Sequence, residues 1–104
     1  MKYVAKKLDL DLELITLSGE VANLSPKIKI NGTNCIKLAN EWKLLEETNL
    51  EKTENKLTGM ELVAIELTTI YPKPKEWWTD NFDPITIREI VAYVSGTMVG
   101  VQKK

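Results

Sequence analysis

Apolar and acidic residues alternate in the segment "KKLDLDLELITL" near the start of the chain. In an extended conformation, leucines would line one side and carboxylates the other: Leu8, Leu10, Leu12 and Leu14 against Asp9, Asp11 and Glu13. A period of two is typical of a β-strand with one buried and one solvated face. The pattern therefore predicts a strand, followed by a turn at Ser18–Glu20.

A second alternating segment, Lys27–Ile30, directly precedes the dipeptide Asn31-Gly32. Asn-Gly is a strong hairpin signal because both central positions of the turn favour positive φ. The pattern predicts a second strand at Lys27–Ile30 with Asn-Gly as its turn. A third strand is left open, because the following residues soon take helical spacing.

Three segments place apolar residues three and four positions apart, which is the spacing of one helix face. Thr33 or Asn34 could cap the first. Thr58 has capping-box spacing with Glu61 at the second, and Asp83-Pro84 joins an N-cap residue to a proline at the first helical position. The three faces comprise Cys35, Leu38, Ala39, Trp42 and Leu45; Met60, Val63, Ala64, Leu67 and Ile70; and Ile87, Ile90, Val91, Tyr93, Val94 and Met98.

The boundaries of these helices follow from the residues between them. "TNLEKTENK" is a polar connector without periodicity, Pro72 ends the second helix, and Gly100 could end the last. A strand is the alternative for "ELVAIELTTI", although the capping signal favours a helix. Together the elements predict an α+β fold: N-terminal antiparallel strands or a hairpin, then about three helices packed together. We expect a single domain over 1–104, β-rich in 1–32 and helical in 33–100.

The composition narrows the class of protein. The chain has 104 residues and a formal net charge of −1, with 43% hydrophobic and 28% charged residues, as in ordinary globular domains. It contains no apolar run of about 18 residues and no signal-peptide pattern, so we expect no membrane association. One cysteine, Cys35, fits a reducing cytoplasm. The lysines are interspersed with acids, which argues against nucleic-acid binding.

The residue types needed for most catalysis are missing. The chain has no histidine, Cys35 therefore has no histidine partner, and no glycine-rich phosphate loop is present. Asp9, Asp11 and Glu13 would lie about 7 Å apart along a strand and could bind a hard cation such as calcium. They lack the glycine and carbonyl ligands of a calcium loop, so a solvated face that discourages aggregation is the simpler interpretation. We expect no enzyme activity, cofactor or metal.

Four of the seven aromatic residues lie in the segment "YPKPKEWWTDNFDP", between the last two predicted helices. Adjacent tryptophans on a helical turn diverge by about 100°, so both can be buried only where two surfaces meet. Tryptophan and tyrosine are frequent at the centres of protein interfaces. The candidate partner-binding residues are Tyr71, Trp77, Trp78 and Phe82. The sequence does not decide which tryptophan is exposed.

The order of the segments supports one resemblance. "KIKINGTNCIKLANEWKLLEE" followed by "PKPKEWWTDNFDPITIREIVAYVSGTMVG" resembles, in layout and over about two-thirds of the chain, the small tail assembly chaperones of long-tailed bacteriophages and prophages. The resemblance implies a non-enzymatic protein in the cytoplasm of the bacterial host. It would bind the tape measure protein, shield its apolar helices and help to recruit tail tube subunits. The family provides no invariant functional residue to carry over.

Two other classes of function remain open. A small phage- or prophage-encoded inhibitor or regulator would bind a host protein, for example through the acidic face at Asp9, Asp11 and Glu13, with both tryptophans buried. A cation-binding domain or enzyme would use the same carboxylates. For the chaperone and for the inhibitor or regulator, the partner is a protein. The sequence does not indicate the oligomeric state.

Overall fold

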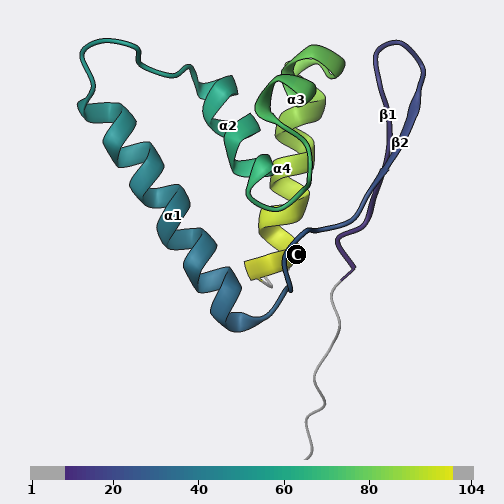
Figure 1. Ribbon diagram of the computed structural model, residues 1–104, viewed down its shortest axis with the longest axis horizontal. Coiled ribbons are helices and arrows are strands. Elements are labelled where there is room, and N and C mark those ends of the chain that lie inside the picture. Colours follow the sequence, from purple (N-terminus) through teal and green to yellow (C-terminus); the bar gives the residue numbers. More distant parts are fainter. Residues whose placement is uncertain (1–8, 100–104) are drawn as a thin grey trace, which may run out of the picture.

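The computed structural model describes residues 9–99 as a hairpin followed by helices (Figure 1). The elements are β1 (Leu12–Ile15), β2 (Val21–Leu24), α1 (Gly32–Glu51), α2 (Gly59–Thr68), α3 (Lys75–Asn81) and α4 (Pro84–Val99). This arrangement confirms the predicted α+β class. The short α3 adds a fourth helix to the three expected. Leu8 and Gly100, which entered the predictions for the first strand and the last helix, lie outside the described residues.

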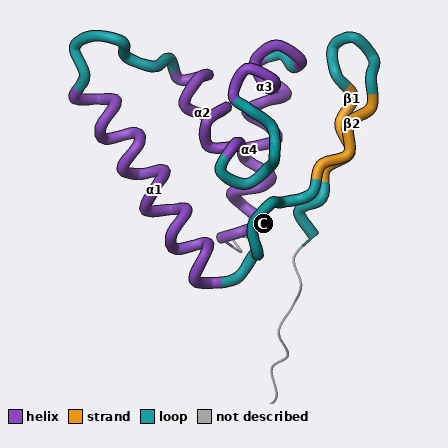
Figure 2. The backbone as a smooth tube through the Cα atoms, viewed as in Figure 1, coloured by secondary structure: helices purple, strands orange, loops and turns teal. Residues whose placement is uncertain are grey.

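The strand predicted from the alternating pattern near the start of the chain is confirmed: β1 forms one arm of a hairpin (Figure 2). Strands β1 and β2 are antiparallel, with Leu12 opposite Leu24 and Ile15 opposite Val21. The predicted turn is present, and Gly19 adopts a φ of 90°, which suits a residue without a Cβ. Leu10 and Leu14 are buried, whereas the acidic residues between them are exposed.

The second strand was predicted at the wrong place. Lys27–Ile30 is not a strand, and Asn31 caps α1 by accepting a hydrogen bond from the Asn34 N–H at 2.8 Å. The predicted caps Thr33 and Asn34 are therefore also wrong. Asn is as good an N-cap as it is a turn residue, and here it serves a helix of 20 residues. The Lys27 N–H donates to the Ile70 carbonyl at 2.6 Å instead of to a strand.

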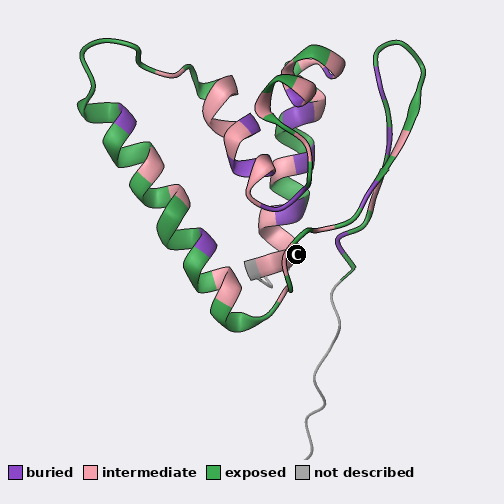
Figure 3. Cartoon of the chain, viewed as in Figure 1, coloured by how far each residue is buried: buried purple, intermediate pink, exposed green. Residues whose placement is uncertain are grey.

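Helix α1 is long but lightly packed. It extends to Glu51 and so includes part of the segment predicted as a polar connector. Of its 20 residues only Leu38 and Asn49 are buried, and Figure 3 shows most of the helix as exposed. The Trp42 indole N–H donates to the Thr69 hydroxyl at 2.9 Å, which joins the middle of α1 to the end of α2.

The core lies between β1, α2, α3 and α4. Thr58 and Glu61 form the predicted capping box, with bonds of 3.1 and 3.0 Å, so the helical interpretation of this segment is confirmed. Asp83 accepts from the Thr86 N–H at 3.0 Å and caps α4. None of the helices within residues 9–99 has the length and apolar character needed to cross a membrane. The buried apolar residues are Leu10, Leu14, Leu24, Leu38, Ala64, Leu67, Ile70, Tyr71, Trp78, Phe82, Ile87, Ile90 and Val94.

Candidate protein-binding surface

Three of the four predicted partner-binding residues lie inside the protein. Tyr71 and Trp78 are fully buried and Phe82 is 5% exposed. The Tyr71 hydroxyl donates to the Leu10 carbonyl at 2.6 Å, which ties the segment to the start of the hairpin. Burial, together with the nearby Tyr93, Asp11 and Asp9, raises the pKa of Tyr71. The aromatic segment is therefore first a connector that completes the core, and α3 determines which of its side chains points inward.

Trp77 is the predicted site residue that reaches the surface. Its ring packs edge-on against Trp78, with centroids 5.0 Å apart, and against Phe82 at 5.4 Å. The Lys73 ammonium lies 5.0 Å from the centre of the Trp77 ring, within cation–π range. The ring is thus held from two sides while part of it stays accessible. A partner-binding role for Trp77 stays a prediction.

A groove of about 280 Å³ separates Trp77 and Lys73 from the hairpin. Its opposite wall consists of Thr16 and the consecutive residues 20–24, which include the whole of β2. The lining includes residues from both faces of β2, so the groove follows the strand along its whole length. The sequence did not predict β2 as a strand. Only two of its four residues, Ala22 and Leu24, are apolar and face inward, which is too short a pattern to recognise.

The edge of β2 carries unpaired backbone groups. The Thr16 N–H donates to the Glu20 carbonyl at 2.8 Å, which closes the hairpin. Thr16 and Glu20 therefore form a hydrogen-bonded pair, and bonded and non-bonded pairs alternate along an antiparallel ladder. Ala22 and Leu24 thus direct their N–H groups toward β1, and Val21 and Asn23 direct theirs outward. The sheet has two strands, and among residues 9–99 no backbone partner lies on the outer edge of β2. An added strand would lie about 4.8 Å away.

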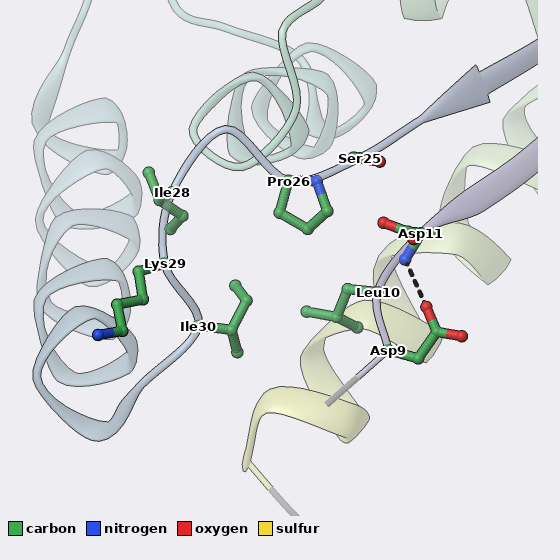
Figure 4. Close-up of a pocket in the computed structure, with 8 residues that line it drawn as sticks. All are labelled: Asp9, Leu10, Asp11, Ser25, Pro26, Ile28, Lys29 and Ile30. Carbon is green, nitrogen blue, oxygen red and sulfur yellow. Dashed lines mark hydrogen bonds between the residues drawn. The ribbon is translucent and has the colours of Figure 1, made fainter. Parts of the chain in front are cut away.

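A larger cavity, of about 640 Å³, opens where the two arms of the hairpin diverge (Figure 4). Leu10 and Ile30 point toward one another across it, and the Asp11 N–H donates to the Asp9 carboxylate at 3.1 Å on its rim. The Lys29 side chain points away from the cavity. The lining continues along the chain from β2 and includes Ser25, Pro26 and Ile28. The lining combines the apolar side chains of Leu10, Ile28 and Ile30 with polar residues on the rim, so the cavity can accept aliphatic side chains.

The acidic face of the hairpin is exposed, as expected from the sequence. Asp9, Asp11 and Glu13 all lie on the surface. Within the described part of the chain, no group of three or more potential ligand side chains could hold a metal ion. The carboxyls with a lowered pKa are cap residues: the pKa of Asp83 is lowered by hydrogen bonds from Thr86, and that of Glu61 by the backbone of Thr58.

Large apolar side chains are exposed at several places that the sequence analysis did not single out. Three gather at the tip of the hairpin, where Ile15 and Leu17 are each 69% exposed and Val21 is 59% exposed. Ile15 and Val21 are directly opposite one another on the two strands. Exposed apolar side chains that cluster mark interaction surfaces more often than isolated ones do. The tip adjoins the β2 groove, because Val21 contributes to both.

Comparison with known protein families, with curated proteins and with solved structures finds no match to this chain.

Proposed function

We propose that the protein is a non-enzymatic binding protein that holds an extended, apolar segment of a partner protein along β2. The unpaired edge of β2, a strand that lines the same groove as Trp77, is the observation that carries the proposal. Extended peptides commonly bind by adding a strand to an open sheet edge, where backbone bonds supply affinity and neighbouring pockets supply selectivity. Here Trp77 would contact an apolar side chain of the partner, and Val21 would extend the contact toward the hairpin tip.

The resemblance in layout to the tail assembly chaperones supplies a candidate partner. On this proposal the protein acts in the bacterial host cytoplasm, where it shields apolar segments of the tape measure protein and assists the recruitment of tail tube subunits. An open edge with an aromatic wall suits a chaperone, because backbone recognition tolerates many side-chain sequences.

A second candidate function is favoured by the exposed carboxylates in β1 and in the residues just before it. A small inhibitor or regulator would use Asp9, Asp11 and Glu13 to meet a basic surface on a host protein. These residues lie in β1 or just before it, so the two candidates predict binding at opposite strands of one hairpin.

The test replaces an outward-facing residue on each edge with proline and measures binding to the tape measure protein of the same genome. Asn23→Pro removes an outward N–H of β2 but leaves the β1–β2 bonds in place, so we expect binding about five- to tenfold weaker. Glu13→Pro is the matched control, because Glu13 is paired with Asn23 but its backbone faces the opposite edge. It should bind as the wild type does.

Trp77→Ala should weaken the same interaction by about tenfold or more if the indole is a central contact. Circular dichroism of each variant checks that the helices persist. Unchanged binding in both Asn23→Pro and Trp77→Ala would overturn the proposed site. Loss of binding to a host protein in Glu13→Pro alone would transfer the function to the acidic edge and favour the inhibitor.

A further inference from the structure

Helix α1 has a second apolar side, opposite the one that packs on α2. Its members are large aliphatic residues that are mostly exposed: Ile36 at 66%, Leu44 at 64% and Leu50 at 71%. At about 100° per residue, the three side chains fall within about 120° of one another around the helix axis. The buried residues of α1, Leu38 and Asn49, lie on the opposite side by the same count. Helix α1 therefore buries one side and leaves a second apolar side exposed.

The outer face of α1, which consists of Ile36, Lys43, Leu44, Glu47 and Leu50, is open along its length. Helix α1 is the outermost element on its side of the molecule (Figure 1), and Figure 3 shows most of its surface as exposed. From Ile36 to Leu50 the face extends about 21 Å at the helical rise per residue. Exposed apolar side chains that cluster mark interaction surfaces. A helical face of this length fits a second helix, because helices pack side by side along such faces.

Two charged residues on the outer face indicate which helix that is. Lys43 and Glu47 lie one helical turn apart, between the aliphatic residues at the two ends of the face. Both are exposed, and neither takes part in the ion pairs of residues 9–99, which both involve Lys75. A reversed copy of the face presents the two charges in the opposite order. Each charge then meets its opposite, so the outer face is complementary to itself.

We propose that two copies of the chain associate through their outer faces, with the two α1 helices antiparallel about a twofold axis beside Leu44. A twofold axis brings the same surface of each copy together. Leu44 then meets Leu44 of the second copy. Ile36 meets Leu50, and Lys43 meets Glu47, each with an offset of two residues, or about 3 Å along the helix. The inference does not depend on the proposed function, because α1 contributes no residue to the β2 groove.

The two kinds of contact have different roles in the dimer. Exposed ion pairs contribute little to affinity, so the aliphatic side chains supply most of the attraction. The charges determine direction and register, because a parallel or shifted pairing brings like charges together. One pair of helices gives an interface at the small end of the usual range. We therefore expect a reversible dimer with a Kd of about 10 µM.

Sedimentation equilibrium of the full chain measures the association directly. The wild type should pass from monomer to dimer as its concentration rises through about 10 µM. Leu44→Gln removes the apolar contact at the axis from both copies and should weaken the dimer by about tenfold or more. Ile85→Gln is the matched control, because Ile85 is 68% exposed on α4, and it should associate as the wild type does. Circular dichroism checks that each variant keeps its helices.

Exchange of the two charges tests the register. Lys43→Glu alone and Glu47→Lys alone each place like charges opposite one another, so each variant should associate about tenfold more weakly than the wild type. In an equimolar mixture of the two variants, opposite charges face one another at both positions, and a heterodimer should form with most of the affinity restored. Each substitution also places like charges one turn apart within its own helix. Mixing does not remove that repulsion, so recovery on mixing reports the contact between chains.

Several results would overturn the dimer. One is a wild type that stays monomeric at about 100 µM, and another is a dimer that Leu44→Gln leaves unchanged. A mixture that associates no more tightly than the single variants would overturn the antiparallel register. If the wild type is monomeric and Leu44→Gln weakens binding to the tape measure protein, the outer face binds that partner instead of a second copy. None of these results affects the β2 groove, which is tested by Asn23→Pro.

Discussion

Helices α1 and α2 have similar apolar spacing in the sequence but very different packing in the fold. The 20 residues of α1 bury two side chains, Leu38 and Asn49. The ten residues of α2 bury three, including Ala64 and Leu67. Helix α2 lies among α1, α3 and α4, whereas α1 packs mainly on α2. Periodic apolar residues therefore predict which face turns inward, and the number of neighbours decides how much of that face is buried.

The comparison implies two levels of stability in one chain. The unit formed by α2, α3 and α4 has a shared apolar core. Helix α1 is attached through separate local contacts, notably the bond of Trp42 to Thr69 and the bonds of Asn49 to Leu57. Regions with few buried contacts open at lower free energy than the core. Substitutions in the core should unfold the whole protein, and those in the contacts of α1 should release that helix alone.

The largest effect is expected for Trp78→Ala. Trp78 is fully buried, and truncation of a large core aromatic costs about 3–5 kcal/mol. The free energy of unfolding, measured in urea, should fall by this amount, and exchange protection should be lost in every helix. Trp77→Ala is the control and should cost less, because this ring is partly exposed. A loss below about 1 kcal/mol for Trp78→Ala would contradict the placement of this side chain.

Asn49→Ala should have an intermediate effect that is confined to the end of α1. Asn49 is 4% exposed, and its amide exchanges bonds of 3.0 and 2.7 Å with the carbonyl and N–H of Leu57. Removal leaves buried polar groups unpaired, at a cost of about 1–3 kcal/mol. Hydrogen exchange should increase near the α1–α2 loop. Asn40→Ala, at an exposed position on the same helix, should change stability little; equal effects of both substitutions would refute the role assigned to Asn49.

Trp42→Phe should have the smallest effect. It keeps an aromatic ring at the interface but removes the 2.9 Å bond to the Thr69 hydroxyl, with an expected loss of about 0.5–1.5 kcal/mol. A double-mutant cycle with Thr69→Ala isolates the interaction between the two side chains. If the two losses simply add, the bond does not hold α1 in place.

Local signals in the sequence were reliable where neighbouring residues decide the structure. The alternation around Leu10 and Leu14, the capping box at Thr58 and the Asp83-Pro84 helix start are all local, and each is present in the fold. Asn31 shows how a local signal can be ambiguous, because the same residue can begin a turn or cap a helix. In this fold Asn31 caps a helix of 20 residues, and β1 pairs with β2 instead of with Lys27–Ile30.

Features created by contacts between distant segments could not be predicted. Nothing in the sequence near Trp42 indicates that its indole N–H will donate to Thr69, because this contact depends on how α1 aligns with α2. The inward position of Trp78 and the partly exposed position of Trp77 depend on the short helix α3, which has too few residues for a clear period. For the candidate site, the sequence identified Trp77 but not the β2 edge opposite it.

The three tryptophans of this chain occupy three distinct environments, and this has a consequence for fluorescence. The buried Trp78 indole N–H has no hydrogen-bond acceptor among residues 9–99. The Trp42 indole N–H donates to a hydroxyl, and the Trp77 ring lies beside an ammonium group and solvent. The fluorescence emission of an indole shifts to longer wavelengths as its surroundings become more polar. Variants that keep one tryptophan at a time would therefore report separately, through their emission wavelength, on the core, on the packing of α1 against α2 and on the groove beside β2.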